Sequence, residues 1–574
     1  MSQFRVISLG GVVVAGLIAL VASFIVLESK TSTSTLYCVS NHSSSHITTL
    51  NSSIPHAKCF RVKDGIFTDI FEDIPMTNDE EVKYLDGYVY PGLIDSHGHI
   101  LPYGEMLESV LLYGAESVAE VRIRIKEFLK KHQGEGYGSR EKWIRGIGWD
   151  QAYFGGVMPT AKELGEDPSL SDLYIMLDRV DVHCVLTSQK VLDLLPNPLP
   201  KAPPGGVIIT EPGPGVFCDN AMDAIIYPLA PKPDVAQKTR WFHAAFAELN
   251  KVGIVGVGDA GMRPDDVSIL ESMVHKDELT IRIDVMLECA ERNTYCPEET
   301  KGLKLLDSPD GMGADMLMLG GVKLFADGAL GSWGAALLEP YSDKPETSGT
   351  MLINETALAN VVKNHPHDQR RITKMGILPS IQPTHATTDM AYALSRLGVE
   401  RLTHSAYRMQ SLFPSSPLNT LSDYPGPVLG SDFPVEPPNP FHGMYAAVTR
   451  LNPATGESPA GLGGWYPEEK LSVEQALLGF TRNAAYGWFK EERMGAIEKG
   501  KWADFVVVDR ELGEDGGKEL RDVVVKETWV GGRRVFPLND RSDQVSWIDR
   551  VYGTISNIVD LAMGWTKGAS REDL

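Results

Sequence analysis

Pro91-Gly92-Leu93-Ile94-Asp95-Ser96-His97-Gly98-His99 is the stretch of this sequence that decides the fold. It begins with a Pro-Gly turn, continues as an apolar, strand-like run and ends in two histidines. Because residues two apart in a strand point to the same face, His97 and His99 can present two imidazoles to one metal ion. This spacing at the carboxyl end of a strand favours a metal site over two separate structural histidines.

The sequence after this stretch alternates between strand-like and helical segments up to about residue 490. Such alternation indicates βα units and a parallel sheet. Residues 91–490 are therefore expected to form one barrel domain. Its strands are expected at Val182–Leu186, Gly253–Val257, Ile281–Leu287, Leu317–Phe325, Ile377–Ile381 and Val428–Gly430, with helices at Val118–Lys131 and Val235–Val252.

Strand-like runs also lie on both sides of this domain. Thr35–Val39 and Cys59–Asp64 precede it, and Ala503–Asp509 and Val523–Val530 follow it. We expect residues 35–90 and 491–540 to build one small β-sandwich from the two ends of the chain.

Several strings beyond the first one resemble a known family. Together with residues 91–99 they look like the amidohydrolase superfamily, and specifically its family 3, the YtcJ-like branch, over most of residues 35–535. The resemblance implies a TIM-like barrel and a metal-dependent hydrolase of carbon–nitrogen bonds, other than peptide bonds, in small amide-like substrates. The supporting strings are Gly148-Trp149-Asp150, Asp178-Arg179-Val180-Asp181-Val182-His183, Val322-Lys323-Leu324-Phe325-Ala326-Asp327-Gly328, Gln382-Pro383-Thr384-His385, Gly430-Ser431-Asp432-Phe433-Pro434-Val435-Glu436 and Gly500-Lys501-Trp502-Ala503-Asp504.

The resemblance implies that His97, His99, Lys323 and Asp432 are metal ligands. In this branch the matching lysine is carboxylated, and its carbamate bridges two metal ions. A buried lysine with a lowered pKa can react with carbon dioxide as the free amine. Asp432 is implied to bind a metal and also to take the proton of the attacking water. The expected cofactor is one or two divalent ions, with a preference for zinc.

Five more residues match pattern positions of the branch. Trp149, Asp150, Arg179 and His183 are candidates for lining the substrate pocket, although a structural role explains each of them equally well. Asp327 is expected in the loop beside the site.

The family pattern is broken near residue 365. Members of the branch supply one histidine from the fifth strand, in a string like HAIGD, and another from the sixth, in a string like EHAQ, and this chain has neither. About fifty residues are absent, including two strands of the barrel. A skipped exon, a faulty gene model and a catalytically impaired pseudoenzyme all remain open, and His365 or His367 as replacement ligands is the less favoured option. A smaller departure is Gly258, where the family often has a histidine before the aspartate that corresponds to Asp259.

The first residues indicate a membrane anchor. The uncharged apolar run Val6–Leu27 is about 22 residues long, enough to cross a bilayer as a helix. A cleaved signal peptide is the alternative, and it would give a secreted protein. Asn41 and Asn51 begin glycosylation acceptor triplets, which favour a lumenal or extracellular catalytic domain. Residues 1–34 are thus read as an anchor and linker.

The net charge and the cysteines restrict which partners and which metal sites the protein is expected to have. A net charge of -22 argues against nucleic acid as a partner, because a nucleic-acid binder needs a basic surface. The six cysteines show no zinc-ribbon spacing. Cys38 and Cys59 can pair in an oxidising compartment or remain two buried thiols. Residues 541–574 carry a helical apolar stripe that is expected to pack on the protein.

Overall fold

The computed structural model describes residues 34–40, 45–76, 81–290, 293, 296–308, 311–353, 377–413 and 425–538. The expected anchor at Val6–Leu27, the helix within 541–574, Asn41, His365 and His367 lie outside these residues. Within them, no helix is both long enough and apolar enough to cross a membrane.

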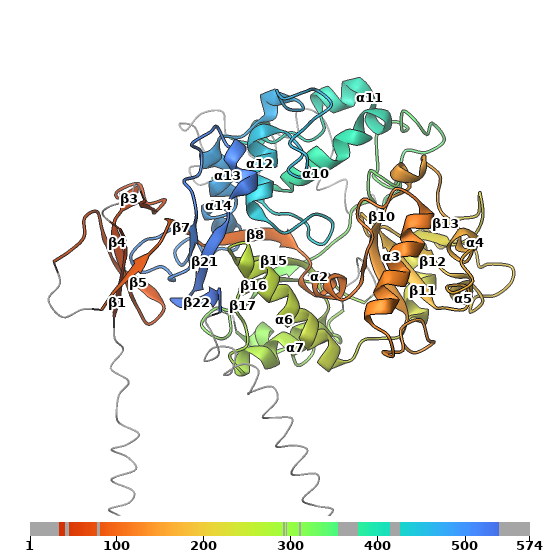
Figure 1. The fold of residues 1–574 in the computed structure, drawn as a ribbon, viewed down its shortest axis with the longest axis horizontal. Helices are drawn as coiled ribbons and strands as arrows, with labels where there is room; N and C mark the ends of the chain where they lie inside the picture. The colour runs from red at the N-terminus through yellow and green to blue at the C-terminus, as the bar shows by residue number, and fades with distance from the viewer. Residues whose placement is uncertain are drawn as a thin grey trace, which may run out of the picture.

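Parallel strands form a barrel wall at the centre of the molecule (Figure 1). Four of them, β8 (Leu93–Gly98), β15 (Ile254–Met262), β16 (Arg282–Leu287) and β17 (Leu317–Val322), are hydrogen-bonded in the order β17-β16-β15-β8. A second parallel pair, β18 (Ser380–Ile381) and β19 (Val428–Leu429), lies on the other side of β8.

The two groups of strands are joined on one side only. Asp432 N, just after β19, donates to His97 O at 2.7 Å, and His99 N donates to Phe433 O at 2.8 Å. These bonds fasten the end of β19 to β8. On the opposite side, no strand of the described residues links β17 to β18. The described part of the barrel wall is therefore open there.

Helices cover the outside of the wall. The amphipathic helix α6 (Val235–Lys251) starts where Asp234 accepts a hydrogen bond from Gln237 N at 2.7 Å, a typical N-cap. With α2 (Ile100–Leu107) and α7 (Pro264–His275) it shares one apolar core with β15 and β16. A second helical layer consists of α10 (Pro383–Thr388), α11 (Ala393–His404), α12 (Pro440–Thr449), α13 (Val473–Gly479) and α14 (Arg482–Gly487).

A separate six-stranded sheet is inserted between α2 and α6. Its order is β13-β14-β12-β11-β10-β9, and α3 (Val118–Lys131), α4 (Ala161–Leu164) and α5 (Gln189–Leu192) lie around it (Figure 1). The strands are β9 (Val110–Leu111), β10 (Ile144–Trp149), β11 (Ile175–Arg179), β12 (Cys184–Thr187), β13 (Gly206–Ile209) and β14 (Val216–Asp219).

One strand that was predicted for the barrel lies in this inserted sheet. The prediction of a barrel strand at Val182–Leu186 is wrong, because β12 runs antiparallel to β11 in the inserted sheet. Only residues 180–183 separate the two strands, and Val182 has a φ of 52°. A link this short makes a hairpin but cannot make the crossover that parallel neighbours need.

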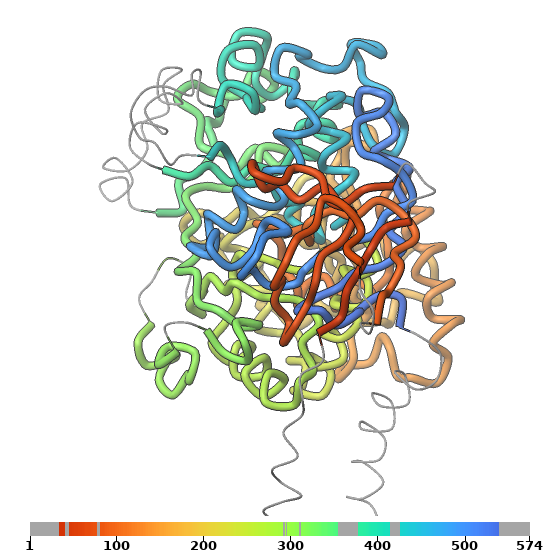
Figure 2. The backbone as a smooth tube through the Cα atoms, turned by 90° about the vertical axis from the view of Figure 1, so that its left-hand side faces the viewer, coloured from red at the N-terminus to blue at the C-terminus, as the bar shows by residue number. Residues whose placement is uncertain are grey.

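The two ends of the chain meet in a pair of sheets beside the barrel. One sheet, in the order β5-β4-β1-β6, contains only N-terminal strands. The other, in the order β22-β21-β20-β7-β2-β3, pairs C-terminal with N-terminal strands, which Figure 2 shows as blue beside red. The strands are β1 (Thr35–Val39), β2 (Ile47–Thr48), β3 (His56–Ala57), β4 (Cys59–Lys63), β5 (Ile66–Phe71), β6 (Val82–Leu85), β7 (Tyr88–Pro91), β20 (Phe505–Val508), β21 (Val525–Val530) and β22 (Arg533–Phe536).

Three disulfides cross-link pairs of cysteines within the described residues. Cys38 and Cys59 are direct partners on the antiparallel strands β1 and β4, so the disulfide alternative holds for them. Cys184 and Cys218 are direct partners on β12 and β14. Cys289 and Cys296 close a short loop after β16. All six cysteines of the chain are thereby paired.

Candidate metal centre

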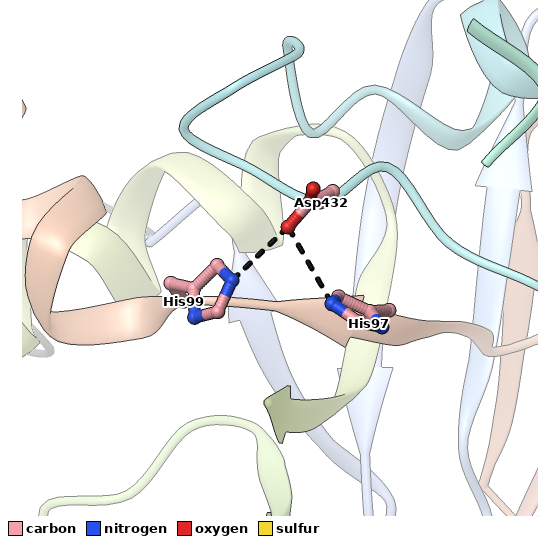
Figure 3. A group of neighbouring side chains, drawn as sticks. All are labelled: His97, His99 and Asp432. Atoms are coloured by element: carbon pink, nitrogen blue, oxygen red, sulfur yellow. Dashed lines mark hydrogen bonds and ion pairs between the residues drawn. The ribbon is translucent and has the colours of Figure 1, made fainter. Parts of the chain in front are cut away.

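Two histidines and an aspartate converge at the carboxyl end of β8. His97 lies on the strand, His99 is the residue before α2, and Asp432 reaches in from the loop after β19 (Figure 3). Asp432 Oδ1 lies 3.0 Å from His99 Nε2 and 3.5 Å from His97 Nε2. One ligand atom from each of the three residues lies within 4.8 Å of the other two. This is a donor set that a single zinc-sized ion can use.

Residues next to these ligands in the sequence hold the ligands in position. Buried Asp95 accepts hydrogen bonds from His97 N at 3.1 Å and from Ser431 Oγ at 2.6 Å, so one carboxylate joins the two strands that carry the ligands. A Cβ on Gly430 would lie 2.6 Å from Asp95 Oδ1 and 2.7 Å from His97 N. The glycine is therefore required for the close approach of the two strand ends.

Lys323 reaches the same point from β17. Its backbone N–H donates to Leu287 O at 2.8 Å, and its Nζ lies 3.4 Å from His97 Nε2. The structure thus brings together all four residues that the sequence predicts as ligands.

A fifth residue, His385, belongs to the group and was missed by the sequence reasoning. It lies on α10, directly after β18, and its Nε2 is 3.7 Å from Asp432 Oδ2. The Nε2 atom is buried and has no hydrogen-bond partner among the described residues. The available signal was its place after an apolar run, in the string Gln382-Pro383-Thr384-His385, which repeats the strand-then-histidine arrangement of β8.

The protonation of the group suits metal binding. Burial lowers the pKa of His97 to about 3, against the opposing charge of Asp432. Burial also acts to lower the pKa of His99, but the hydrogen bond and charge of Asp432 outweigh it and raise the pKa above its ordinary value. Burial alone would raise the pKa of Asp432, yet the His99 hydrogen bond and the neighbouring imidazoles hold it well below its usual range. An ionised carboxylate beside imidazoles, with one orphaned ring nitrogen, fits a divalent cation.

Asp259 supports the site without joining it. Its Oδ2 accepts the hydrogen bond from Ile100 N at 2.9 Å, which fixes the start of α2 next to His99. Burial raises the pKa of Asp259 to about 6. A Cβ on Gly258 would lie 2.6 Å from Ser96 O, so this backbone leaves no room for a histidine at that position.

The predicted substrate residues of the inserted sheet are tied to one another. Arg179 is buried, donates to Asp150 Oδ1 at 2.8 Å and to Gln151 Oε1 at 2.6 Å, and forms an ion pair with Asp181. These contacts hold the guanidinium in place, and a role of Arg179 and Asp150 in substrate binding stays a prediction. For Trp149 the geometry favours the structural alternative, because its ring is completely buried in the core of the sheet and its Nε1 donates to Leu177 O at 2.8 Å.

The remaining two predicted residues lie in other contacts. His183 Nδ1 is 2.7 Å from Asp219 Oδ1. Asp327 accepts a hydrogen bond from Ala336 N at 2.8 Å, and burial raises its pKa although the charge of His183 lowers it. A role for either in substrate binding stays a prediction.

Two partly buried acids near His385 were also not singled out. Asp389 accepts hydrogen bonds from the hydroxyls of Tyr392 and Tyr407. Burial raises the pKa of Glu436 to about 7, against the charge of His385. Glu436 stands in the same string after β19 as Asp432 but was not singled out, whereas the place of Asp389 follows only from the fold.

Comparison with known proteins agrees with this arrangement. The model of the amidohydrolase family matches residues 86–368 and 364–536. The chain belongs to the amidohydrolase family. The relationship to its family 3, the YtcJ-like branch, is thereby confirmed.

Relatives of this amidohydrolase cover most of its length. Protein LONG AFTER FAR-RED 3 of Arabidopsis thaliana is 26% identical over 550 residues, with 86% of this chain and 90% of that protein covered. The putative amidohydrolase YtcJ of Bacillus subtilis (strain 168) is 24% identical over 534 residues, with 82% and 93% covered. A crystal structure of an uncharacterized metal-dependent hydrolase from Pyrococcus horikoshii OT3 has a TM-score of 0.61 at 23% identity, with 83% and 98% covered. This likeness supports the TIM-like hydrolase fold.

The comparisons also bear on the break in the pattern. The two segments that match the family model meet at residues 364–368, where the sequence analysis places the missing strands. The alignment to the Arabidopsis relative is 550 positions long, yet it covers only 86% of the 574 residues of this amidohydrolase. It therefore contains positions at which the relative has residues and this chain has none.

Proposed function

We propose that this protein is a metal-dependent hydrolase of carbon–nitrogen bonds in small amide-like substrates other than peptides. The observation that carries the proposal is the convergence of His97, His99 and Asp432, with ligand atoms within 4.8 Å of one another. Lys323 and His385, at 3.4 Å from His97 and 3.7 Å from Asp432, complete the group.

The residues divide into ligands and a proton acceptor. His97, His99 and Asp432 would hold a divalent ion, for which zinc suits the imidazole and carboxylate donors. Lys323 would act as a carbamate: its free amine adds carbon dioxide, a C–N bond forms and one proton is released. When bound, the cation lowers the pKa of water toward about 7 and polarises a carbonyl group.

Asp432 is placed to handle the proton. Its Oδ1 faces His97 and His99, whereas its Oδ2 faces His385. The carboxylate would accept a proton from the attacking water and deliver it to the leaving nitrogen. His385 is close enough to Asp432 to hold this carboxylate in orientation.

A second candidate function is a catalytically impaired scaffold. The open side of the described wall between β17 and β18 and the split in the family match both favour a chain that lacks barrel strands 5 and 6, and with them a second metal position. This candidate shares the fold and differs in the chemistry that it permits.

One set of measurements separates the two candidates. The transcript is sequenced across the codons for Leu358–Arg371, and the purified protein is assayed for zinc content and for hydrolysis of a panel of N-formyl and N-acetyl amines. A transcript with the HAIGD-like and EHAQ-like strings supports an ordinary dinuclear hydrolase. A matching transcript with one zinc per chain, and activity that Asp432→Asn abolishes, supports a mononuclear enzyme. If the protein neither binds zinc nor turns over any substrate of the panel, the result supports the catalytically impaired scaffold.

We also propose that the catalytic domain faces a lumen or the cell exterior, attached through the expected anchor. Six paired cysteines are typical of an oxidising compartment. Asn51 lies between β2 and β3, where its Oδ1 accepts a hydrogen bond from the exposed Ser53 N at 2.8 Å. Such a turn is accessible to glycosylation. Digestion with an N-glycanase should lower the mass of the expressed protein, and Asn51→Gln should remove one glycan; unchanged masses in both would contradict the proposal.

A further inference from the structure

The loop closed by Cys289 and Cys296 carries one residue of unusual backbone conformation. Asn293 lies within this loop and has a φ of 61°. Asparagine adopts the left-handed region more readily than other residues with a side chain. The conformation turns the amide of Asn293 toward the segment that follows β17.

The side chain of Asn293 holds two backbone segments at once. Its Oδ1 accepts from Phe325 N at 2.7 Å, and its Nδ2 donates to Phe325 O at 2.8 Å and to Leu352 O at 2.8 Å. The paired bonds to Phe325 imitate those that a neighbouring strand would make with it. Phe325 is two residues from Lys323, so this clamp acts directly on the segment that delivers Lys323 to His97.

The segment that follows β17 lies at an edge of the described parallel sheet. In the parallel sheet, β17 is paired with β16, apart from a short antiparallel bridge between Leu317 and Met312, and the described residues supply no strand on its other side. Lys323 N donates to Leu287 O at the end of this pairing. Beyond that bond, the Asn293 amide provides the backbone partners of Phe325.

We propose that Asn293, fixed by the Cys289–Cys296 disulfide, is a positioning residue for Lys323 in the metal centre. The inference rests on the proposed function and adds a part of the chain that the family pattern does not assign. The disulfide links two residues on either side of Asn293, and Asn293 fixes the backbone of Phe325, two residues after the Lys323 that extends to His97. Groups that orient metal ligands typically contribute about 10- to 100-fold in metal affinity.

The test uses Asn293→Gly in the full chain. Glycine keeps the left-handed backbone conformation at no steric cost, so the variant removes only the three side-chain hydrogen bonds. We expect faster hydrogen exchange at the Phe325 amide, roughly tenfold weaker zinc binding in a chelator competition, and an altered visible spectrum of the cobalt(II)-loaded protein.

The disulfide is tested with a matched pair of double variants. Cys289→Ala/Cys296→Ala should reproduce the Asn293→Gly effects, whereas Cys184→Ala/Cys218→Ala, which removes a disulfide of the inserted sheet, should leave zinc affinity and Phe325 exchange unchanged. Wild-type exchange at Phe325 in Asn293→Gly would overturn the inference whether or not zinc binds. Equal zinc affinity in wild type and Asn293→Gly would overturn it as well. Failure of the wild-type protein to bind zinc would instead count against the proposed function, and the exchange measurement distinguishes that case.

Discussion

Asp284 is a carboxyl group in a position that burial makes costly when it is charged. It lies on β16 and is buried, and a Cβ on Gly320 of the neighbouring strand would be 2.1 Å from its Oδ2. Burial raises the pKa of Asp284 to about 7, with a small opposing effect from Lys490. Below about pH 7 the folded protein therefore favours the protonated form of this side chain.

This shift predicts a pH-dependent gain for Asp284→Asn. Because the folded pKa is raised above the unfolded value of 3.8, the stability linked to Asp284 is fully present below pH 3.8 and is lost as the pH rises through about 7. The variant should gain roughly 4 kcal/mol in free energy of unfolding at pH 8 and little at pH 4. Urea titrations at the two pH values measure this, and equal effects at both would refute it.

At the scale of elements, an ion pair joins the barrel to the sheet made from both chain ends. Arg282 of β16 donates to Asp504 through Nε at 2.7 Å and through Nη2 at 3.0 Å, and both side chains are almost fully buried. The guanidinium also lies 3.9 Å over the ring of Trp502, and Asp504 accepts from Gly531 N at 2.7 Å. The barrel and the shared sheet are thus held together by contacts of the string Gly500-Lys501-Trp502-Ala503-Asp504.

Removal of the aspartate should be costly. Asp504→Ala leaves a buried guanidinium without its counter-charge, and we expect a loss on the order of 3–5 kcal/mol in the free energy of unfolding. The control is Asp69→Ala, which breaks the more exposed Arg61–Asp69 pair at 2.8 Å and should cost less than about 1 kcal/mol. Urea midpoints compare the two, and similar losses would show that the buried pair has no special weight.

The sequence predicted individual elements better than their arrangement. The bounds of β1, α3 and β16 follow from local patterns of apolar and capping residues, and they were predicted to within a residue. The direction of β12 was not, because an apolar run does not show which neighbour it will pair with. The hairpin depends on the short link after β11, which only a count of the residues between two strands would reveal.

The candidate site was likewise predicted in part, its residues better than their arrangement. His97, His99, Lys323 and Asp432 stand in recognisable strings, and the structure brings them together. His385 also stands in a string that follows a strand, but the string alone does not show that its imidazole reaches Asp432. The role of Asn293 depends on which segments lie side by side in three dimensions, and it has no local signature in the chain.

At the scale of the whole molecule, the open side of the described barrel wall exposes apolar side chains. Leu319, Val322 and Leu324, on and just after β17, are 40%, 69% and 54% exposed. An apolar edge strand invites pairing with another chain. This exposed edge predicts that the protein aggregates readily on warming.

The prediction can be checked with one charge. Leu319→Glu should slow the growth of light scattering at elevated temperature, because a charge on an edge strand opposes edge-to-edge pairing. Leu462→Glu is the control, since Leu462 is 83% exposed but lies in a loop away from any sheet edge. Equal slowing by both variants would mean that net charge, and not the β17 edge, governs the aggregation.

The sheet shared by the two chain ends also determines when, during synthesis, its strands can pair. β7 pairs with β20, Val89 opposite Val507, and roughly 400 residues separate them along the chain. At about 5–20 residues per second, the ribosome needs on the order of 20–80 seconds between making the first strand and making its partner. During that interval the edge of β7 that pairs with β20 has no partner strand, and an unpaired strand edge can pair with another chain until the last segment has emerged.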